Sequence, residues 1–122
     1  MDFFDRRYVE GDAWHYRFFV PGDIEGMIEL FGGKDKFIEQ LDIFIHRSEF
    51  YPIFALPNPY YWAGNEHDLL SVWLFNNAGR PDKTQMYSRW LLKHVYSTAA
   101  DGLPGNDDYG TMSAWLIFAT IG

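Results

Sequence analysis

Apolar residues recur at helical spacing near the start of the chain. Between residues 24 and 31 they lie three or four positions apart, which places their side chains on one face of an α-helix. Asp23 is a residue type that caps helix N-termini, and the glycine pair at 32–33 is typical of a helix end. The pattern therefore predicts a helix that begins after Asp23 and ends at Leu30 or Phe31.

The same spacing continues in later segments. It predicts further helices over residues 35–46, 68–77, 81–96 and 109–121, with Pro81 suited to a first helical turn. Three prolines exclude a helix interior from most of residues 48–66. Strand-like alternation is absent, although residues 18–20 are compatible with a short strand or a helix end. The sequence thus predicts an all-α fold of paired helices with long loops.

Three loops gather polar residues in otherwise apolar surroundings, at residues 8–16, 60–68 and 102–110. Each mixes carboxylates with aromatic rings and glycine, a mixture that suits a sugar site. Carboxylates serve as acid and base, rings stack on the apolar faces of sugars, and glycines let the backbone approach a ligand. The oxygen-rich groups also suit Ca²⁺, although their spacing does not match an EF-hand.

Simpler roles compete with these at individual carboxylates. Glu10 alone is more often a surface or helix-capping group. Asp68, and one of Asp107 and Asp108, are plausible helix N-caps. From the residues alone, the sequence predicts a helical domain with a carboxylate-rich face of loops.

Composition excludes several other classes. The net charge is −7 and the ten basic residues are scattered, which argues against a nucleic-acid surface. Without cysteine there are no disulfides, thiolate zinc sites or thiol nucleophiles. No apolar run is long enough for a membrane span, and the N-terminus lacks the pattern of a signal peptide, so the segment itself leaves localisation open.

The ordered motifs of these loops resemble those of one enzyme family. Residues 8–14, YVEGDAW, are similar to Tyr-x-Glu-Gly-Asn-Ala-Trp of the glycoside hydrolase family 92 α-mannosidases, and residues 19–23, FVPGD, to its Phe-Val-Pro-His-Asp. Further matches follow in the family's order at residues 30–33, 64–66, 77–85 and 102–115. One such motif is a weak signal, whereas six in order indicate family membership.

The resemblance implies a particular architecture. Residues 1–122 would be part of a catalytic (α/α)6 barrel, with the rest of the barrel and an N-terminal β-sandwich domain outside the chain. The parent enzyme is expected to need those parts and to be secreted, periplasmic or extracellular. An open piece of barrel is expected to expose apolar side chains such as Phe31, Phe44 and Trp90.

The resemblance also implies an activity. Family members remove terminal α-linked mannose, here expected to be α-1,2-linked, from mannosides or N-glycans with inversion and with the assistance of Ca²⁺. Carried over by position, Glu10 is the general acid and Asp108 the general base, with Asp107 as the alternative base. Asn65 and Glu66 are the expected calcium-binding residues.

The remaining expected site residues are those that contact the sugar, namely Trp14, Tyr16, Trp62 and Asn106. Four positions depart from the family's pattern: Asp12, His15, Gly22 and His67 stand where Asn, Gln, His and Pro are usual. None of them removes a proposed catalytic carboxylate. A second hypothesis from another class is a non-catalytic helical module that only binds a glycan or a protein partner.

Overall fold

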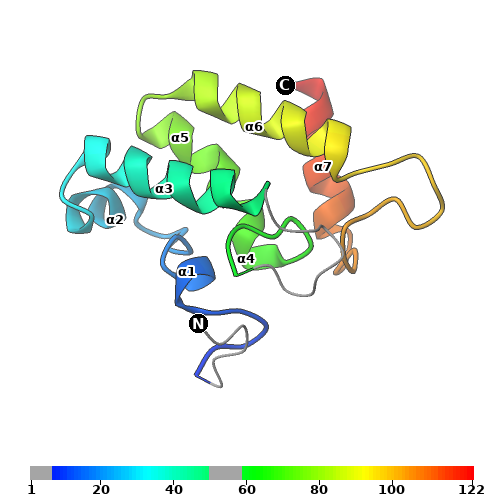
Figure 1. Cartoon of the computed structure of the whole chain (residues 1–122), viewed down its shortest axis with the longest axis horizontal. Coiled ribbons are helices and arrows are strands. Elements are labelled where there is room, and N and C mark those ends of the chain that lie inside the picture. Colours follow the sequence, from blue (N-terminus) through cyan, green and yellow to red (C-terminus); the bar gives the residue numbers. More distant parts are fainter. Residues whose placement is uncertain (1–6, 50–58) are drawn as a thin grey trace.

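The computed structural model describes residues 7–49 and 59–122, and every regular element in these two ranges is helical (Figure 1). The elements are α1 (Ala13–Tyr16), α2 (Ile24–Leu30), α3 (Lys34–Ser48), α4 (Glu66–Leu69), the 3₁₀ helix η1 (Ser71–Trp73), α5 (Leu74–Asn77), α6 (Pro81–His94) and α7 (Thr111–Ile121). The predicted all-α class is confirmed for this part of the chain. None of its helices is both long and apolar enough to cross a membrane.

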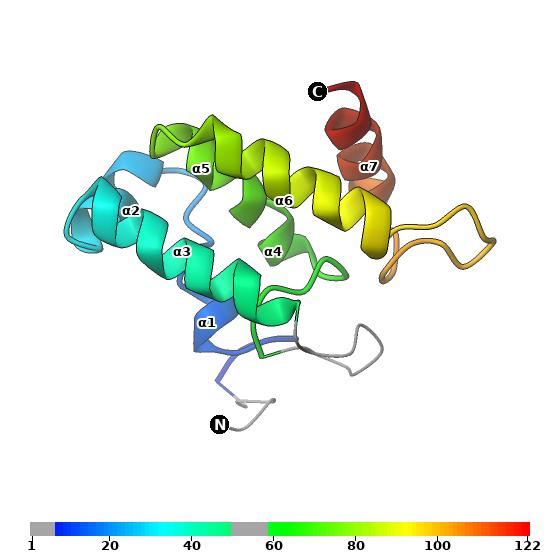
Figure 2. The ribbon, with the colours of Figure 1, turned by 45° about the horizontal axis from the view of Figure 1, so that its top comes forward.

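The two long helices, α3 and α6 (Figures 1 and 2), are joined at Asp42. Asp42 on α3 accepts hydrogen bonds from Lys83 Nζ and Tyr87 Oη on α6, both at 2.6 Å from the same oxygen. Burial alone would raise the pKa of Asp42, but these two bonds and the charge of Lys83 outweigh it and lower the pKa. The resulting charge-assisted pair fixes one helix against the other.

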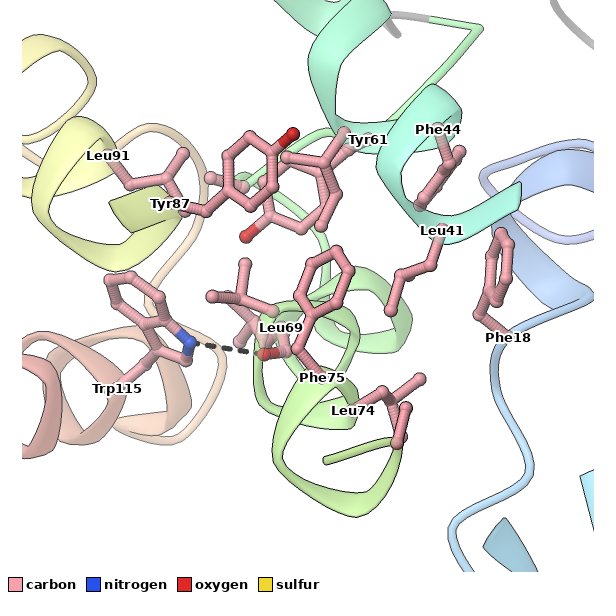
Figure 3. Packing of buried hydrophobic residues seen from close by; sticks show 14 of the residues in the cluster. Phe18, Leu41, Phe44, Tyr61, Leu69, Leu74, Phe75, Tyr87, Leu91 and Trp115 are labelled. Carbon is pink, nitrogen blue, oxygen red and sulfur yellow. Dashed lines mark hydrogen bonds between the residues drawn. The ribbon is translucent and has the colours of Figure 1, made fainter. Parts of the chain in front are cut away.

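The hydrophobic core lies between these helices and the short segments α4, η1 and α5 (Figure 3). Phe44 is fully buried, with its ring centroid 5.1 Å from that of Phe18 and 6.1 Å from that of Tyr61. The expected exposure of Phe44 is therefore wrong, and Phe31 and Trp90 are half-buried. Phe44 belongs to the core of the described residues, and Phe31 and Trp90 pack against it.

Exposed apolar side chains gather on the last helix. Ile117, Phe118 and Ile121 of α7 expose 57%, 68% and 73% of their surface. Beside them, an open hollow of about 560 Å³ is lined mainly by apolar side chains of α4, η1 and α7. The apolar flank that the sequence predicts thus exists, but it lies on α7.

The helices α2 and α3 form close to where the sequence predicts them. Asp23 Oδ1 accepts a hydrogen bond from the Gly26 N–H at 2.9 Å and so caps α2. Gly32 and Gly33 follow with φ values of 92° and 98°, a left-handed conformation that glycine adopts without strain. The predicted Gly-Gly turn is confirmed, and α3 extends the predicted helix slightly at both ends.

The prediction of a single helix over residues 68–77 is wrong in detail. The segment is divided into α4, η1 and α5. Leu69 O accepts a hydrogen bond from Trp115 Nε1 at 3.1 Å, and Trp73 N–H donates instead to Leu70 O at 2.9 Å (Figure 3). Competition from a distant side chain thus replaces an α-helical bond with a 3₁₀ bond.

The later helix ends also differ from the predicted ones. α6 ends at His94, two residues early, and α7 begins at Thr111 because Asp108, Tyr109 and Gly110 all have positive φ values that no helix tolerates. Residues 18–20 form neither a strand nor a helix end but an irregular segment after α1. Residues 59–65 are irregular as predicted, and residues 50–58 lie outside the described ranges.

Candidate functional site

The three polar loops meet in space through closely packed glycines. A Cβ on Gly11 in the first loop would lie 3.1 Å from His67 Nε2 in the second. A Cβ on Gly64 would lie 2.7 Å from the carbonyl oxygen of Pro104 in the third, and one on Gly105 would collide with the carbonyl oxygen of Gly64. The glycines therefore bring one loop against another, whereas the sequence predicted an approach of backbone to ligand.

Asn65 joins the first two loops. Its side-chain oxygen accepts a hydrogen bond from the Glu66 N–H at 3.1 Å, which caps α4. Its side-chain nitrogen donates to the carbonyl oxygen of Glu10 at 2.6 Å, and the residue is only 3% exposed. The prediction that Asp68 caps this helix is wrong, because α4 begins two residues earlier and Asp68 lies inside it.

Four carboxylates gather where the loops meet. Partial burial raises the pKa of Asp108, and a hydrogen bond and charge from Glu66 and the charges of Glu10 and Asp107 raise it further. Asp107 has a different partner, since its Oδ1 accepts a hydrogen bond from the Ser113 N–H at 2.7 Å in the first turn of α7. The N-cap residue of α7 is Gly110, so the prediction that Asp107 or Asp108 occupies that position is wrong, although the Asp107 side chain reaches the Ser113 N–H.

Both expected catalytic carboxylates have unusual backbone conformations. Glu10 has a φ of 52° and Asp108 a φ of 45°, and Tyr109 at 57° is the one other non-glycine residue with positive φ in the described ranges. Side chains rarely adopt this region because of steric strain, which is tolerated mainly at functional sites and tight turns. The fold thus holds these two residues in strained geometry.

The first loop also contains a short helix that the sequence analysis missed. Asp12 caps α1 by accepting hydrogen bonds from the Trp14 and His15 N–H groups, and His15 Nδ1 accepts one from the Asp12 N–H at 3.0 Å. This reciprocal arrangement is a capping box in which histidine takes the place of the usual Glu or Gln. Because Asp12 N–H is a donor, Nδ1 is unprotonated and His15 Nε2 donates to Tyr60 O at 2.7 Å.

Beneath the loops lies a buried polar group that the sequence did not indicate. Asp68 has no exposed surface, and its Oδ2 accepts a hydrogen bond from the Trp62 N–H at 2.9 Å and lies 3.7 Å from His15 Nε2. Within the described residues, Asp68 Oδ1 and Asp12 Oδ2 have no hydrogen-bond partner. Burial raises the pKa of Asp68 well above its usual range, and the charge of Asp12 contributes, while the Trp62 bond opposes them.

His67 packs as a neutral aromatic ring. Burial lowers its pKa to about 4. The ring stacks on Tyr16 with centroids 4.6 Å apart, and Tyr16 Oη donates to the Val9 carbonyl at 2.6 Å. His67 and Tyr16 thereby support the loop that carries Glu10.

The expected sugar-contacting residues fall into different environments. Trp14 lies parallel to Phe44 and contacts the Arg17 guanidinium, 4.6 Å from the ring centroid. Trp14 and Tyr16 also line an open hollow of about 530 Å³ together with Tyr8, Ala13 and Arg17. This hollow adjoins the Glu10 loop.

The other two expected sugar contacts lie elsewhere. Trp62 is half-buried and packs against Gly64, and it lines a small void of about 30 Å³ with residues of α6. Asn106 is exposed on the third loop. The structure therefore places Trp14 and Tyr16 at one hollow and does not bring Trp62 into it.

A calcium ion at these loops would need several oxygen ligands. Carboxylate oxygens at Glu10, Glu66 and Asp108 have the chemistry that Ca²⁺ prefers. However, the described residues contain no group of three His, Asp or Glu side chains arranged to hold an ion. Both polar ends of the Asn65 side chain are also engaged, so the site is not a preformed cage.

Comparison with known proteins identifies the family. The sequence profile of the Glycosyl hydrolase family 92 catalytic domain matches residues 2–122. The chain belongs to this family. It is also similar to a protein of Arthroderma benhamiae described as an uncharacterized secreted glycosidase, with 34% identity over 113 residues. That match covers 93% of this chain and 13% of the relative, so the chain spans a small part of the relative's length.

Two of the residues that depart from the usual family 92 pattern contact each other. Asp12 and His15 stand where Asn and Gln are usual, and they are the two partners of the α1 capping box. The sequence signal was a capping residue followed three positions later by a hydrogen-bonding side chain. No comparable signal marked Asp68, because its role depends on a loop that packs over it.

The buried carboxyl of Asp68 generates a pH-dependent prediction for this family 92 chain. Its folded-state pKa lies above the unfolded value of about 3.9, so the stability that it contributes is present below that pH and is lost as pH rises through the folded pKa. Asp68→Asn keeps an acceptor for the Trp62 N–H without the charge. The melting temperature of the variant relative to the wild type should therefore rise between pH 4 and pH 8.

Asp101→Asn removes a carboxylate from an exposed loop and is the matched control, for which we expect no such trend. A relative melting temperature of Asp68→Asn that falls with increasing pH would show that the ionised carboxylate stabilises the fold.

Proposed function

We propose that this chain supplies the acid and base of a glycosidase that removes terminal α-linked mannose with inversion. The observation that carries the proposal is the convergence of Glu10 and Asp108. They come from opposite ends of the chain, yet the charge of Glu10 raises the pKa of Asp108. Family membership and the similarity to a protein described as a glycosidase support the same reaction class.

In an inverting reaction, the two carboxyl groups have different roles. Glu10 donates a proton to the oxygen of the departing sugar, and Asp108 removes a proton from the water that attacks the anomeric carbon from the opposite face. Such pairs stand roughly 6.5–9.5 Å apart, which leaves room for the water. Mannosides or N-glycans with α-1,2 linkages are the proposed substrates, following the family resemblance.

Asp108 is a better base than Asp107 on the contacts seen here. Asp107 already accepts a hydrogen bond from the first turn of α7, which limits the movement of its side chain. Asp108 instead faces Glu66 and Glu10, and its raised pKa makes it a stronger base.

The hollow beside the acid is the proposed position for part of the substrate. Trp14 and Tyr16 present aromatic surface there, which suits the apolar C–H faces of a sugar. The other proposed contacts are Trp62, which lines a separate void, and Asn106, which is exposed on the third loop. Glu10 is exposed in this structure, so a seated sugar and the remaining parts of the parent enzyme would have to exclude water from it.

Calcium is proposed as an assisting ion, because the family resemblance implies it. Glu66 is the proposed ligand because its carboxylate lies near those of Asp108 and Glu10, and additional oxygen donors would have to join because the described residues offer no complete group. When bound, such an ion acts as a Lewis acid and a template for the sugar hydroxyls.

The setting of the site is also a proposal. We propose that the parent enzyme is secreted, in line with the description of the similar Arthroderma benhamiae protein as secreted. We further propose that this segment works within a larger catalytic domain, where the apolar face of α7 packs against further helices.

Removal of the acid tests the core of the proposal. Glu10→Gln keeps the shape of the side chain but cannot donate a proton, so in the full-length enzyme kcat/KM for an α-1,2-mannobiose should fall by about 10²–10⁴-fold. Glu29→Gln, on an exposed position of α2, is the matched control and should retain wild-type activity. Mannose release by Glu10→Gln at the control rate would overturn the assignment of the acid.

The two adjacent aspartates can be separated by a pair of variants. Asp108→Asn should reduce kcat by about 10²-fold or more with little change in melting temperature. Asp107→Ala should mainly lower the melting temperature, because it removes the acceptor of the Ser113 N–H, a bond worth about 0.5–1.5 kcal/mol. The opposite ranking of the two kcat values would move the base to Asp107.

Metal removal tests the calcium proposal. Treatment with EDTA should slow mannose release, and added Ca²⁺ should restore it better than Mg²⁺, which demands a stricter geometry. Glu66→Gln should raise the Ca²⁺ concentration needed for half-restoration. A rate that is insensitive to EDTA would exclude the ion from this reaction.

A further inference from the structure

We propose that Asn65 is a positioning residue that holds the general acid in place, and that its side chain does not serve as a calcium ligand. The inference rests on the proposed role of Glu10 as the acid. The juxtaposition that carries it is the 2.6 Å hydrogen bond from Asn65 Nδ2 to the Glu10 carbonyl oxygen, made by a side chain that is almost fully buried.

The chemistry of its partners fixes the orientation of the Asn65 amide. The Glu66 N–H is a donor and must face Oδ1, whereas the Glu10 carbonyl is an acceptor and must face Nδ2. The second N–H of the amide lies toward His67 Nε2 at 3.4 Å. A flipped amide would set like groups against each other at both ends.

The bond acts on the backbone dihedral angles that aim the acid. The carbonyl of Glu10 belongs to the peptide that joins it to Gly11, so fixing the carbonyl fixes ψ at Glu10. With a φ of 52°, Glu10 would relieve backbone strain by returning to negative φ. That rotation would redirect its Cα–Cβ bond and carry the carboxyl group away from Asp108.

The other end of the amide is anchored to rigid structure. Asn65 caps α4, and α4 is fixed to α7 through the hydrogen bond from Trp115 Nε1 to Leu69 O. Buried Asp68 ties the same helix to the backbone of Trp62. Through these bonds, Asn65 fixes the position of the Glu10 backbone relative to the core.

The test uses two variants that keep the helix cap and remove the donor. Asn65→Asp preserves size and the acceptor for the Glu66 N–H, and Asn65→Ser preserves a neutral capping acceptor that is too short to reach Glu10. Kinetics of the full-length enzyme would be measured on two substrates, an α-1,2-mannobiose and 2,4-dinitrophenyl α-mannoside. The second has a leaving group that departs with little help from an acid.

A misplaced acid should affect the two substrates differently. For both variants we expect kcat on the mannobiose to fall by about 10²-fold, the loss typical of a misplacement of about 1 Å, while kcat on the dinitrophenyl mannoside falls by less than about fivefold. KM and the Ca²⁺ requirement should change little. Asp23→Ala removes a helix cap on α2, away from the site, and should not produce this substrate dependence.

The same assay separates failure of this inference from failure of the proposed function. Glu10→Gln must show the selective loss on the mannobiose, and if it does not, the assignment of the acid fails. If Glu10→Gln shows it but both Asn65 variants lose the two substrates in equal proportion, Asn65 is only structural. An increased Ca²⁺ requirement in both variants would return Asn65 to the role of a metal ligand.

Discussion

The capping of α4 by Asn65 is the interaction that couples the three loops to the core. A helix N-terminus leaves backbone N–H groups without partners, and here a side chain from the second loop satisfies one of them. The same side chain reaches the first loop at Glu10, while close packing of Gly64 and Gly105 brings in the third loop. Loops far apart in the sequence thereby share one short helix as their support.

That helix is stabilised by tertiary contacts, since four residues are too few to form a stable helix alone. Trp115 supplies a hydrogen bond to its last carbonyl, and buried Asp68 supplies an acceptor to the loop before it. The Trp115 bond that interrupts the helix after Leu69 also attaches α4 to α7. Through α4, α7 and the second loop are therefore held together.

The sequence predicted those elements whose signals are local. Asp23 and the glycine pair at 32–33 mark the two ends of α2, and all of these signals lie within a few residues of the helix. The apolar stripe of α3 is visible in its own sequence, so its prediction required no information about distant residues. The division of residues 66–77 was not predictable, because the decisive donor, Trp115, lies more than forty positions away. The burial of Phe44 was missed for a related reason: the rings that cover it, Phe18 and Tyr61, come from irregular segments without a periodic signal.

The candidate site also contains residues that local motifs predicted and residues that only distant packing explains. Motif order placed Glu10, Asp108 and the Asn65–Glu66 pair in one neighbourhood, and the loops do converge there. The buried group formed by Asp12, His15 and Asp68 was not predicted, since burial of a carboxyl depends on what packs above it. A family pattern identifies residues that touch a substrate more readily than those that hold such residues in place.

Backbone strain links these two kinds of residue. Glycine at position 10 or 108 would adopt the observed positive φ without strain, but it would remove the carboxylate. A carboxylate at these positions is therefore compatible with the fold only if neighbouring bonds oppose its relaxation to negative φ. At Glu10 the opposing bond comes from Asn65, and at Asp108 its own carbonyl accepts hydrogen bonds from the N–H and hydroxyl of Thr111 at the start of α7. Each strained carboxylate is thus restrained at its carbonyl by a helix terminus, so the positions of Glu10 and Asp108 depend on α4 and α7, the two helices that Trp115 joins.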